Sequence, residues 1–220
     1  SGSATLCPPM VDRPDAGGEF AVARKSGAVA VTVGDPLHPS DIAIVTNGGV
    51  RKLTHLNEDL AAKAMAQVQK LPVTSSVDQW PIDAWMVTPP NFDPAKKYPL
   101  ILEIHGGPFA AYGPAFSTDD QLYAADGYVV LYTNPRGSTS YCEQFANLID
   151  KAYPGHDYDD LMSAVDAAIA TGHVDPGNLF VTGGSGGGVL TAWIVGKTDR
   201  FRAAATQKPV IDWASFALTS

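Results

Sequence analysis

Residues 179–196, LFVTGGSGGGVLTAWIVG, decide the fold expected for the rest of the chain. The apolar residues 179–181 predict a buried strand, and the apolar residues that follow position 188 recur with helical spacing. Between them, residues 183–187 fit the pattern G-x-S-x-G with Ser185 at the centre. A serine on a sharp turn between strand and helix is typical of a nucleophile elbow, where free N–H groups of the helix lie beside the hydroxyl. The stretch predicts Ser185 as a nucleophile; the alternative is a glycine-rich loop without chemistry.

The composition is that of an ordinary globular protein. The chain has 220 residues, and 45% of them are apolar, which is enough for one sizeable core. Its net charge is −8. The negative charge argues against nucleic acid or an anionic membrane as a partner, and no apolar run reaches membrane-spanning length. Cys7 and Cys142 lie far apart and match no zinc spacing, so we expect two unpaired thiols.

The first part of the chain predicts a small antiparallel sheet. Short apolar runs at 28–33, 41–46 and 50–53 read as strands, and Asn47-Gly48-Gly49 is a strong hairpin turn. Three or four strands are too few for a stable domain, so residues 1–56 look like a lead-in and one blade of something larger. From Asn57, a candidate N-cap, to Lys70 the sequence favours a helix, and Pro72 then ends it. We therefore predict a connecting helix and a domain boundary at 57–72.

From residue 73 the pattern changes to strands that alternate with helices. The expected strands lie at 77–80, 82–88, 99–104, 128–133, 179–181 and 203–206, and the expected helices lie at 117–126, at 157–171 and after Ser185. Alternation of this kind predicts right-handed crossovers and a mostly parallel sheet with helices on both faces, which is the α/β class.

A second motif, His105-Gly106-Gly107-Pro108, follows the strand expected at 99–104. Lipases and esterases place the donors of an oxyanion hole in such a loop, and acyl transfer needs donors for the developing negative charge. The N–H groups of Gly107 and Gly186 are the candidates, with Gly106 as the second choice in the loop. His105 precedes the serine, whereas the base follows it in α/β-hydrolases, so we expect His105 to shape the loop by hydrogen bonding.

Four segments together resemble the prolyl oligopeptidase family of serine peptidases, in its bacterial acylaminoacyl peptidase and dipeptidyl aminopeptidase branch. They are HGGPFAAYGPAF, YTNPRGSTSY, YDDLMSAVDAAI and the stretch from Asn178 to Trp213. The resemblance implies an α/β-hydrolase fold, with residues 73–220 as the N-terminal part of the catalytic domain. It also implies that residues 1–56 are a remnant of the last blade of a β-propeller.

The resemblance also implies roles for single residues. Ser185 would be the nucleophile, and Gly186 with the Gly106-Gly107 loop would supply the oxyanion hole. His105 stands where dipeptidyl peptidases carry a tyrosine that helps this hole, so a polar role in the substrate pocket is implied as well. The remaining pocket positions are Trp213 and Phe216, for which a place in the core is the alternative. Arg136 matches a structural arginine that pairs with an acid.

The acid and base of a catalytic triad are not evident in the chain. All five histidines precede Ser185, and the only carboxylates after it are Asp199 and Asp212, neither with a histidine partner. A serine without a base is a poor nucleophile. We therefore expect the triad Asp and His to lie outside this chain, the fold to be incomplete at its C-terminal end, and the chain alone to have almost no activity.

The expected whole is a serine peptidase that acts on short peptides, with the remainder of the same polypeptide as this chain's partner. It would release aminoacyl, dipeptidyl or acyl-peptide products through an acyl-enzyme. A serine esterase on the same fold, or a catalytically incomplete hydrolase-like fragment, are the alternatives. The resemblance implies neither metal nor cofactor, and it leaves open a homo-oligomer and a place in the bacterial cytoplasm or periplasm.

Overall fold

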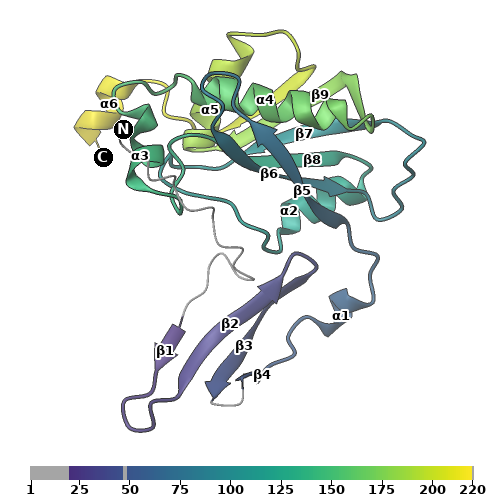
Figure 1. Cartoon of the computed structure of the whole chain (residues 1–220), viewed down its shortest axis with the longest axis vertical. Helices are drawn as coiled ribbons and strands as arrows, with labels where there is room; N and C mark the ends of the chain where they lie inside the picture. The colour runs from purple at the N-terminus through teal and green to yellow at the C-terminus, as the bar shows by residue number, and fades with distance from the viewer. Residues whose placement is uncertain (1–19, 47–48, 220) are drawn as a thin grey trace, which may run out of the picture.

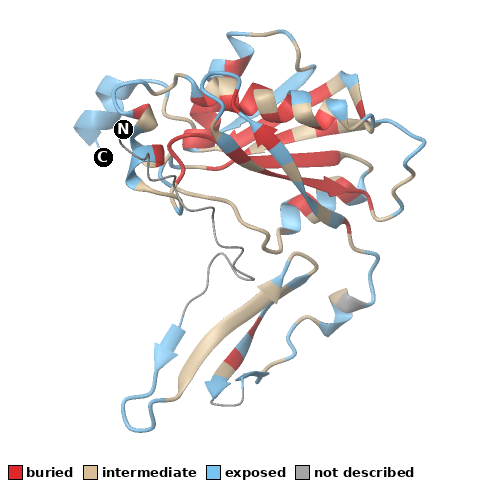
Figure 2. Cartoon of the chain, in the orientation of Figure 1, coloured by how far each residue is buried: buried red, intermediate tan, exposed pale blue. Residues whose placement is uncertain are grey.

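The computed structural model describes residues 20–46 and 49–219, which form a small antiparallel sheet and a larger mixed sheet (Figure 1). The small sheet has the order β1-β2-β3-β4. Its strands are β1 (Phe20–Val22), β2 (Val29–Asp35), β3 (His38–Thr46) and β4 (Gly49–Lys52). Only Asp41 and Ala43 are buried among the described residues of this sheet, as its pale and tan colours in Figure 2 show. Strands β2, β3 and β4 match the strands predicted at 28–33, 41–46 and 50–53, although the turn residues Asn47 and Gly48 lie outside the described residues.

The large sheet has six strands in the order β10-β9-β7-β8-β6-β5. They are β5 (Gln67–Thr74), β6 (Pro81–Thr88), β7 (Tyr98–Ile104), β8 (Val129–Asn134), β9 (Val174–Gly184) and β10 (Ala203–Gln207). The four strands β10, β9, β7 and β8 are parallel, and β6 and β5 continue the sheet antiparallel. The predicted mostly parallel sheet is thus confirmed.

Helices cover both faces of this sheet (Figure 1). The α-helices are α1 (Glu58–Ala61), α2 (Thr118–Ala125), α3 (Glu143–Ala146), α4 (Asp157–Ala170), α5 (Gly186–Val195) and α6 (Trp213–Thr219), with the 3-10 helix η1 (Asn147–Ile149) after α3. Helix α2 begins where the sequence predicted, because the Ser117 side chain accepts a hydrogen bond from the Asp120 N–H. None of the described helices is long and apolar enough to cross a membrane.

Alternate residues of the central strands pack into two different layers, as the period of a strand requires. Leu102 on β7 and Leu131 on β8 join the main core, which includes Leu161 of α4 and Ile194 of α5. Their sequence neighbours face the other way, where Tyr132 packs near Trp85 and Ala124 of α2. Red is concentrated on the central strands in Figure 2, and β8 is buried along its whole length. The two predicted glycine motifs lie at the carboxyl ends of β7 and β9 in this part of the sheet.

The predicted helix over 57–70 is wrong, because α1 has only four residues and β5 begins at Gln67. The alanine-rich sequence favours a helix, but β5 pairs with β6 over eight residues, and tertiary pairing overrides local propensity. Pro72 lies inside β5 instead of ending a helix. It is tolerated there because β5 is an edge strand. The outer side of an edge strand has no partner, so a proline without an N–H costs no hydrogen bond on that side.

The strand predicted at 77–80 is also wrong, since these residues form the loop of the β5–β6 hairpin. The Ser75 N–H donates to the Trp80 carbonyl (2.8 Å), the Gln79 N–H donates to the Ser75 carbonyl (3.1 Å), and Gln79 has φ of 62°. These hydrogen bonds reverse the chain, so the turn replaces an extended strand. The division of the chain into blade, connector and hydrolase part stays a prediction.

Cys142 corrects the expectation of two free thiols, because it is disulfide-bonded. The chain's other cysteine, Cys7, lies outside the described residues. The Cys142 sulfur also accepts a hydrogen bond from the Phe145 N–H at 3.4 Å, and so caps α3.

Candidate active site

Ser185 lies at the sharp turn between β9 and α5. Its φ of 57° and ψ of −116° fall in a region that non-glycine residues rarely occupy. The Ser185 N–H donates to the Gln207 carbonyl on β10 (3.0 Å), and its own carbonyl accepts from the Val189 N–H of α5 (3.0 Å). Such backbone strain costs about 1–3 kcal/mol and persists only where the surroundings impose it. The geometry is that of the predicted elbow.

The glycines after Ser185 are required because the β7 loop touches the first turn of α5. A Cβ added at Gly186 would lie 2.1 Å from the Gly107 carbonyl oxygen, and one at Gly187 would lie 2.0 Å from the Ile104 carbonyl oxygen. Both distances are far shorter than a van der Waals contact. Glycine at these positions therefore lets two backbone segments that are distant in sequence approach within contact distance.

The HGG loop lies directly against the elbow. A Cβ on Gly106 would be 3.2 Å from the Gly184 carbonyl oxygen and 3.4 Å from Cβ of Ser185. Gly107 has φ of 113°, which favours glycine, and its backbone adjoins Gly186. Among the described residues, neither the Gly107 nor the Gly186 N–H has a hydrogen-bond acceptor. Two free donors thus come together beside Ser185.

His105 lies behind this loop and outside the lining of the cavity beside Ser185. It is 8% exposed, its Nδ1–H donates to the Gly106 carbonyl (2.7 Å), and its Nε2 lies 3.0 Å from the Ser138 hydroxyl. Burial lowers the pKa of His105, although the bond to Gly106 opposes this. In a trans peptide the N–H points opposite to the C=O, so this bond turns the Gly107 N–H away from His105. These contacts fit the predicted loop-shaping role, and they place His105 away from the expected pocket.

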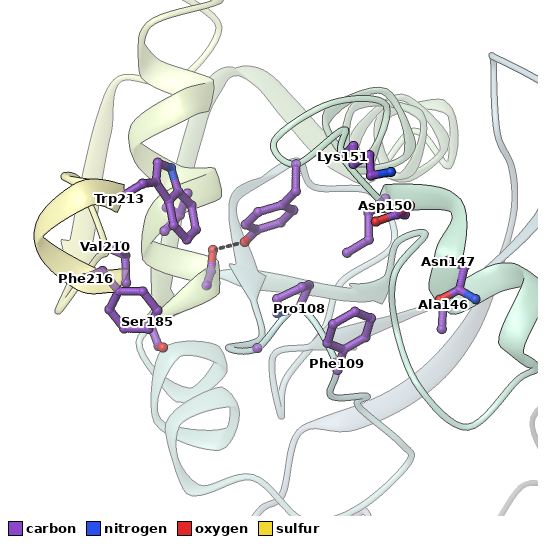
Figure 3. Close-up of a pocket in the computed structure, with 15 residues that line it drawn as sticks. Pro108, Phe109, Ala146, Asn147, Asp150, Lys151, Ser185, Val210, Trp213 and Phe216 are labelled. Atoms are coloured by element: carbon purple, nitrogen blue, oxygen red, sulfur yellow. Dashed lines mark hydrogen bonds between the residues drawn. The ribbon is translucent and has the colours of Figure 1, made fainter. Parts of the chain in front are cut away.

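A cavity of about 480 Å³ opens beside Ser185 (Figure 3). It is lined by Gly107, Pro108, Phe109, Ala146, Asn147, Ile149, Asp150, Lys151, Tyr153, Ser185, Gly186, Val189, Val210, Trp213 and Phe216. Trp213 and Phe216 come from α6, and their rings meet edge to face with centroids 6.1 Å apart. They are 47% and 45% exposed, so the structure places both on the cavity and neither in the core.

Sequence reasoning missed the wall that η1 and the following loop contribute. Tyr153 is the largest residue of this wall; its ring lies 6.1 Å from that of Trp213, and its hydroxyl donates to the Gly186 carbonyl at 3.0 Å. No motif marks Tyr153, because the contact joins positions 33 residues apart. An aromatic residue in a polar loop was the only available signal.

Arg136 forms the buried ion pair that the sequence predicted. Its guanidinium bonds both carboxylate oxygens of Asp160 at 2.9 Å and also reaches Asp78 at 3.2 Å. The Asp160 side chain is 0% exposed. These bonds tie the loop after β8 to α4 and to the β5–β6 hairpin, so they support the cavity wall without touching the cavity.

No histidine lies on the cavity, in a chain whose five histidines all fall within the described residues. His38 and His156 each pair with a nearby aspartate, Asp35 and Asp159, at 2.8 and 2.7 Å. Asp212 accepts from backbone N–H groups at the start of α6 and has no histidine beside it. The described site therefore contains Ser185, two free N–H groups and a pocket, but no histidine that could serve as the base of a triad.

Comparison with known proteins gives consistent matches. The model of the prolyl oligopeptidase family matches residues 114–220. The uncharacterized peptidase YuxL of Bacillus subtilis is 41% identical over 187 residues, which is 84% of this chain and 28% of that protein. Dipeptidyl-peptidase 5 of Aspergillus fumigatus is 38% identical over 118 residues, 52% of this chain and 16% of that protein. These matches confirm the resemblance predicted from the four motifs.

Solved structures agree with the fold. The acylaminoacyl peptidase of Pyrococcus horikoshii superposes with a TM-score of 0.83 at 25% identity, over 92% of this chain and 32% of that one. A puromycin-hydrolyzing peptidase of Mycobacterium tuberculosis gives 0.78 at 25% identity, over 88% and 30%. The chain thus has the α/β-hydrolase fold in part, and it spans less than a third of the length of these relatives.

Proposed function

Because residues 114–220 belong to the prolyl oligopeptidase family, we propose that this chain is the nucleophile-bearing part of a serine peptidase that cleaves short peptides. The observation that carries the proposal is the meeting of Ser185 with the free N–H groups of Gly107 and Gly186 at one cavity. A nucleophile beside two donors and an apolar pocket is what acyl transfer needs.

In the proposed reaction Ser185 Oγ attacks the carbonyl carbon of the scissile peptide bond. The hydroxyl proton passes to a histidine base, and the carbonyl oxygen becomes an oxyanion that Gly107 and Gly186 stabilise through their N–H groups. The C–N bond then breaks, the amine leaves with the proton, and an ester remains on Ser185. Water cleaves this ester with the same base. The triad Asp and His belong to the remainder of the polypeptide in this proposal.

The cavity favours a large apolar residue before the scissile bond. Apolar and aromatic residues make up much of its lining, among them Trp213, Phe216, Val210 and Tyr153, and such walls select side chains by burial of apolar area. A related acylaminoacyl peptidase, 26% identical with a TM-score of 0.84, has been solved with Z-Gly-Gly-Phe-chloromethyl ketone. That ligand supports a phenylalanine-type residue as the occupant of the corresponding space here.

The test compares the natural polypeptide that contains this chain with its Ser185→Ala variant. A fluorophosphonate should add one label to the natural polypeptide and none to the variant, as intact mass spectrometry reports. This chain alone should label far more slowly, since it lacks a base. Equal labelling of the Ser185→Ala variant would refute the proposal.

Substrates then separate the alternatives. Aminoacyl-, dipeptidyl- and acyl-peptide p-nitroanilides should be hydrolysed with kcat/KM well above background, with preference for phenylalanine before the anilide. Hydrolysis of p-nitrophenyl esters without any anilide cleavage would favour a serine esterase. A folded natural polypeptide that neither labels nor hydrolyses either substrate would favour the catalytically incomplete scaffold.

A further inference from the structure

Gly186 combines two requirements that conflict. A side chain is excluded, because a Cβ there would meet the Gly107 carbonyl oxygen at 2.1 Å. Glycine, however, has more backbone freedom than any other residue. Gly186 is also the first residue of α5, where an N–H has no partner within the helix. The Gly186 N–H shares a rigid peptide plane with the Ser185 carbonyl, which accepts from the Val189 N–H of α5. The position of this donor therefore follows the position of the first turn of α5.

Tyr153 anchors this first turn from outside the helix. Its hydroxyl donates to the Gly186 carbonyl at 3.0 Å, which the dashed line in Figure 3 marks. Burial raises the pKa of Tyr153, and the nearby Asp157 carboxylate adds to this effect. The phenol is therefore protonated throughout the neutral range and remains a donor. The bond holds the Gly186 carbonyl, and with it the first turn of α5, against the loop that contains Tyr153.

The ring of Tyr153 has a second role in the same place. It lines the cavity and meets the Trp213 ring edge to face, with centroids 6.1 Å apart and planes at 77°. A substrate side chain in the cavity would thus contact the same residue that holds Gly186. Phe216 also meets the Trp213 ring, but among the described residues that line the cavity only Tyr153 donates a side-chain hydrogen bond to the Gly186 carbonyl.

We propose that Tyr153 is a positioning residue for the oxyanion hole and a specificity-determining residue of the pocket. Its hydroxyl holds the first turn of α5, which carries the Gly186 donor, and its ring shapes the wall that receives the substrate side chain. The inference rests on the proposed peptidase function, in which the Gly186 N–H stabilises the oxyanion.

The test separates the hydroxyl from the ring in the natural polypeptide. Tyr153→Phe keeps the ring and removes one hydrogen bond, so kcat for a phenylalanyl p-nitroanilide should fall about fivefold while KM changes less than twofold. Tyr153→Leu also removes the ring contact with Trp213. It should raise KM for the phenylalanyl substrate by a further two- to tenfold relative to an alanyl substrate.

Tyr158→Phe is the matched control, because Tyr158 is also half-buried against the main core, does not line the cavity, and has no hydroxyl hydrogen bond among the described residues. It should leave kcat and KM unchanged. The inference is overturned if Tyr153→Phe retains the native kcat, or if it changes only the melting temperature. Ser185→Ala keeps the two questions apart, since activity in that variant contradicts the proposed function whatever Tyr153 does.

Discussion

Replacing Gly186 with alanine tests the contact between the elbow and the HGG loop. The added Cβ would lie 2.1 Å from the Gly107 carbonyl oxygen, whereas an ordinary contact begins at 3.4 Å. The loop and the first turn of α5 must therefore separate by about 1.3 Å. The neighbour is backbone held by His105 through Gly106, so it cannot move aside as the end of a flexible side chain would.

That displacement moves both proposed donors relative to Ser185. A misplacement of about 1 Å in an active site can reduce the rate about 100-fold, and loss of one oxyanion donor reduces kcat about 100- to 1,000-fold. We therefore expect Gly186→Ala to lower kcat/KM for peptide anilides by about 100- to 1,000-fold. Fluorophosphonate labelling of Ser185 should slow by a comparable factor, because it also passes through a charged intermediate.

Gly196→Ala is the control within the same helix. A Cβ there lies 3.5 Å from the Trp193 carbonyl oxygen, and Gly196 has an ordinary helical φ of −83°. It should retain native kinetics. Circular dichroism and the melting temperature establish that both variants are folded. A folded Gly186→Ala variant with more than a third of the native kcat/KM would refute the assignment of these donors.

Three further predictions concern the pocket and its support. Trp213→Ala should raise KM for phenylalanyl substrates several-fold more than for alanyl substrates, because it removes apolar wall from the cavity; steady-state kinetics on the two substrates measure the ratio. Arg136→Met should lower the free energy of unfolding by about 3–5 kcal/mol, since it leaves the fully buried Asp160 unpaired; urea unfolding measures the loss, and an unchanged midpoint would contradict it. Burial raises the pKa of Asp157 from 3.8 to about 6, so the folded state binds the proton more tightly than the unfolded state. The contribution of Asp157 to the free energy of unfolding is therefore greatest below about pH 4 and is lost as the pH rises to about 6. The native protein should lose about 3 kcal/mol relative to Asp157→Asn across that range, and parallel pH profiles of unfolding would contradict this.

The sequence predicted those parts of the site in which local chemistry dictates the backbone. The elbow at Ser185 and the loop at Gly106 and Gly107 need glycine for steric reasons that leave a visible pattern. Buried parallel strands such as β7 and β8 also leave a pattern, since they read as continuous apolar runs.

The remaining features depend on contacts that no local pattern reveals. Helix signals at 57–70 were overridden when β5 paired with β6. Tyr153 reaches Gly186 across 33 positions, and the Cys142 disulfide depends on where the chain brings a second thiol. His105 has the chemistry of a pocket residue, but both of its ring nitrogens are engaged behind the loop.

Acylation of Ser185 during turnover is the central claim, and trapping the acyl-enzyme tests it most directly. The natural polypeptide would be mixed with an excess of an acyl-phenylalanine p-nitrophenyl ester, quenched in acid within one turnover, and digested with trypsin. The proposal predicts an adduct on the peptide of residues 152–197, located by fragmentation at Ser185. Two results would contradict it. One is an adduct at another residue, such as Ser163 in the same peptide. The other is turnover by both the native protein and the Ser185→Ala variant with no adduct in either.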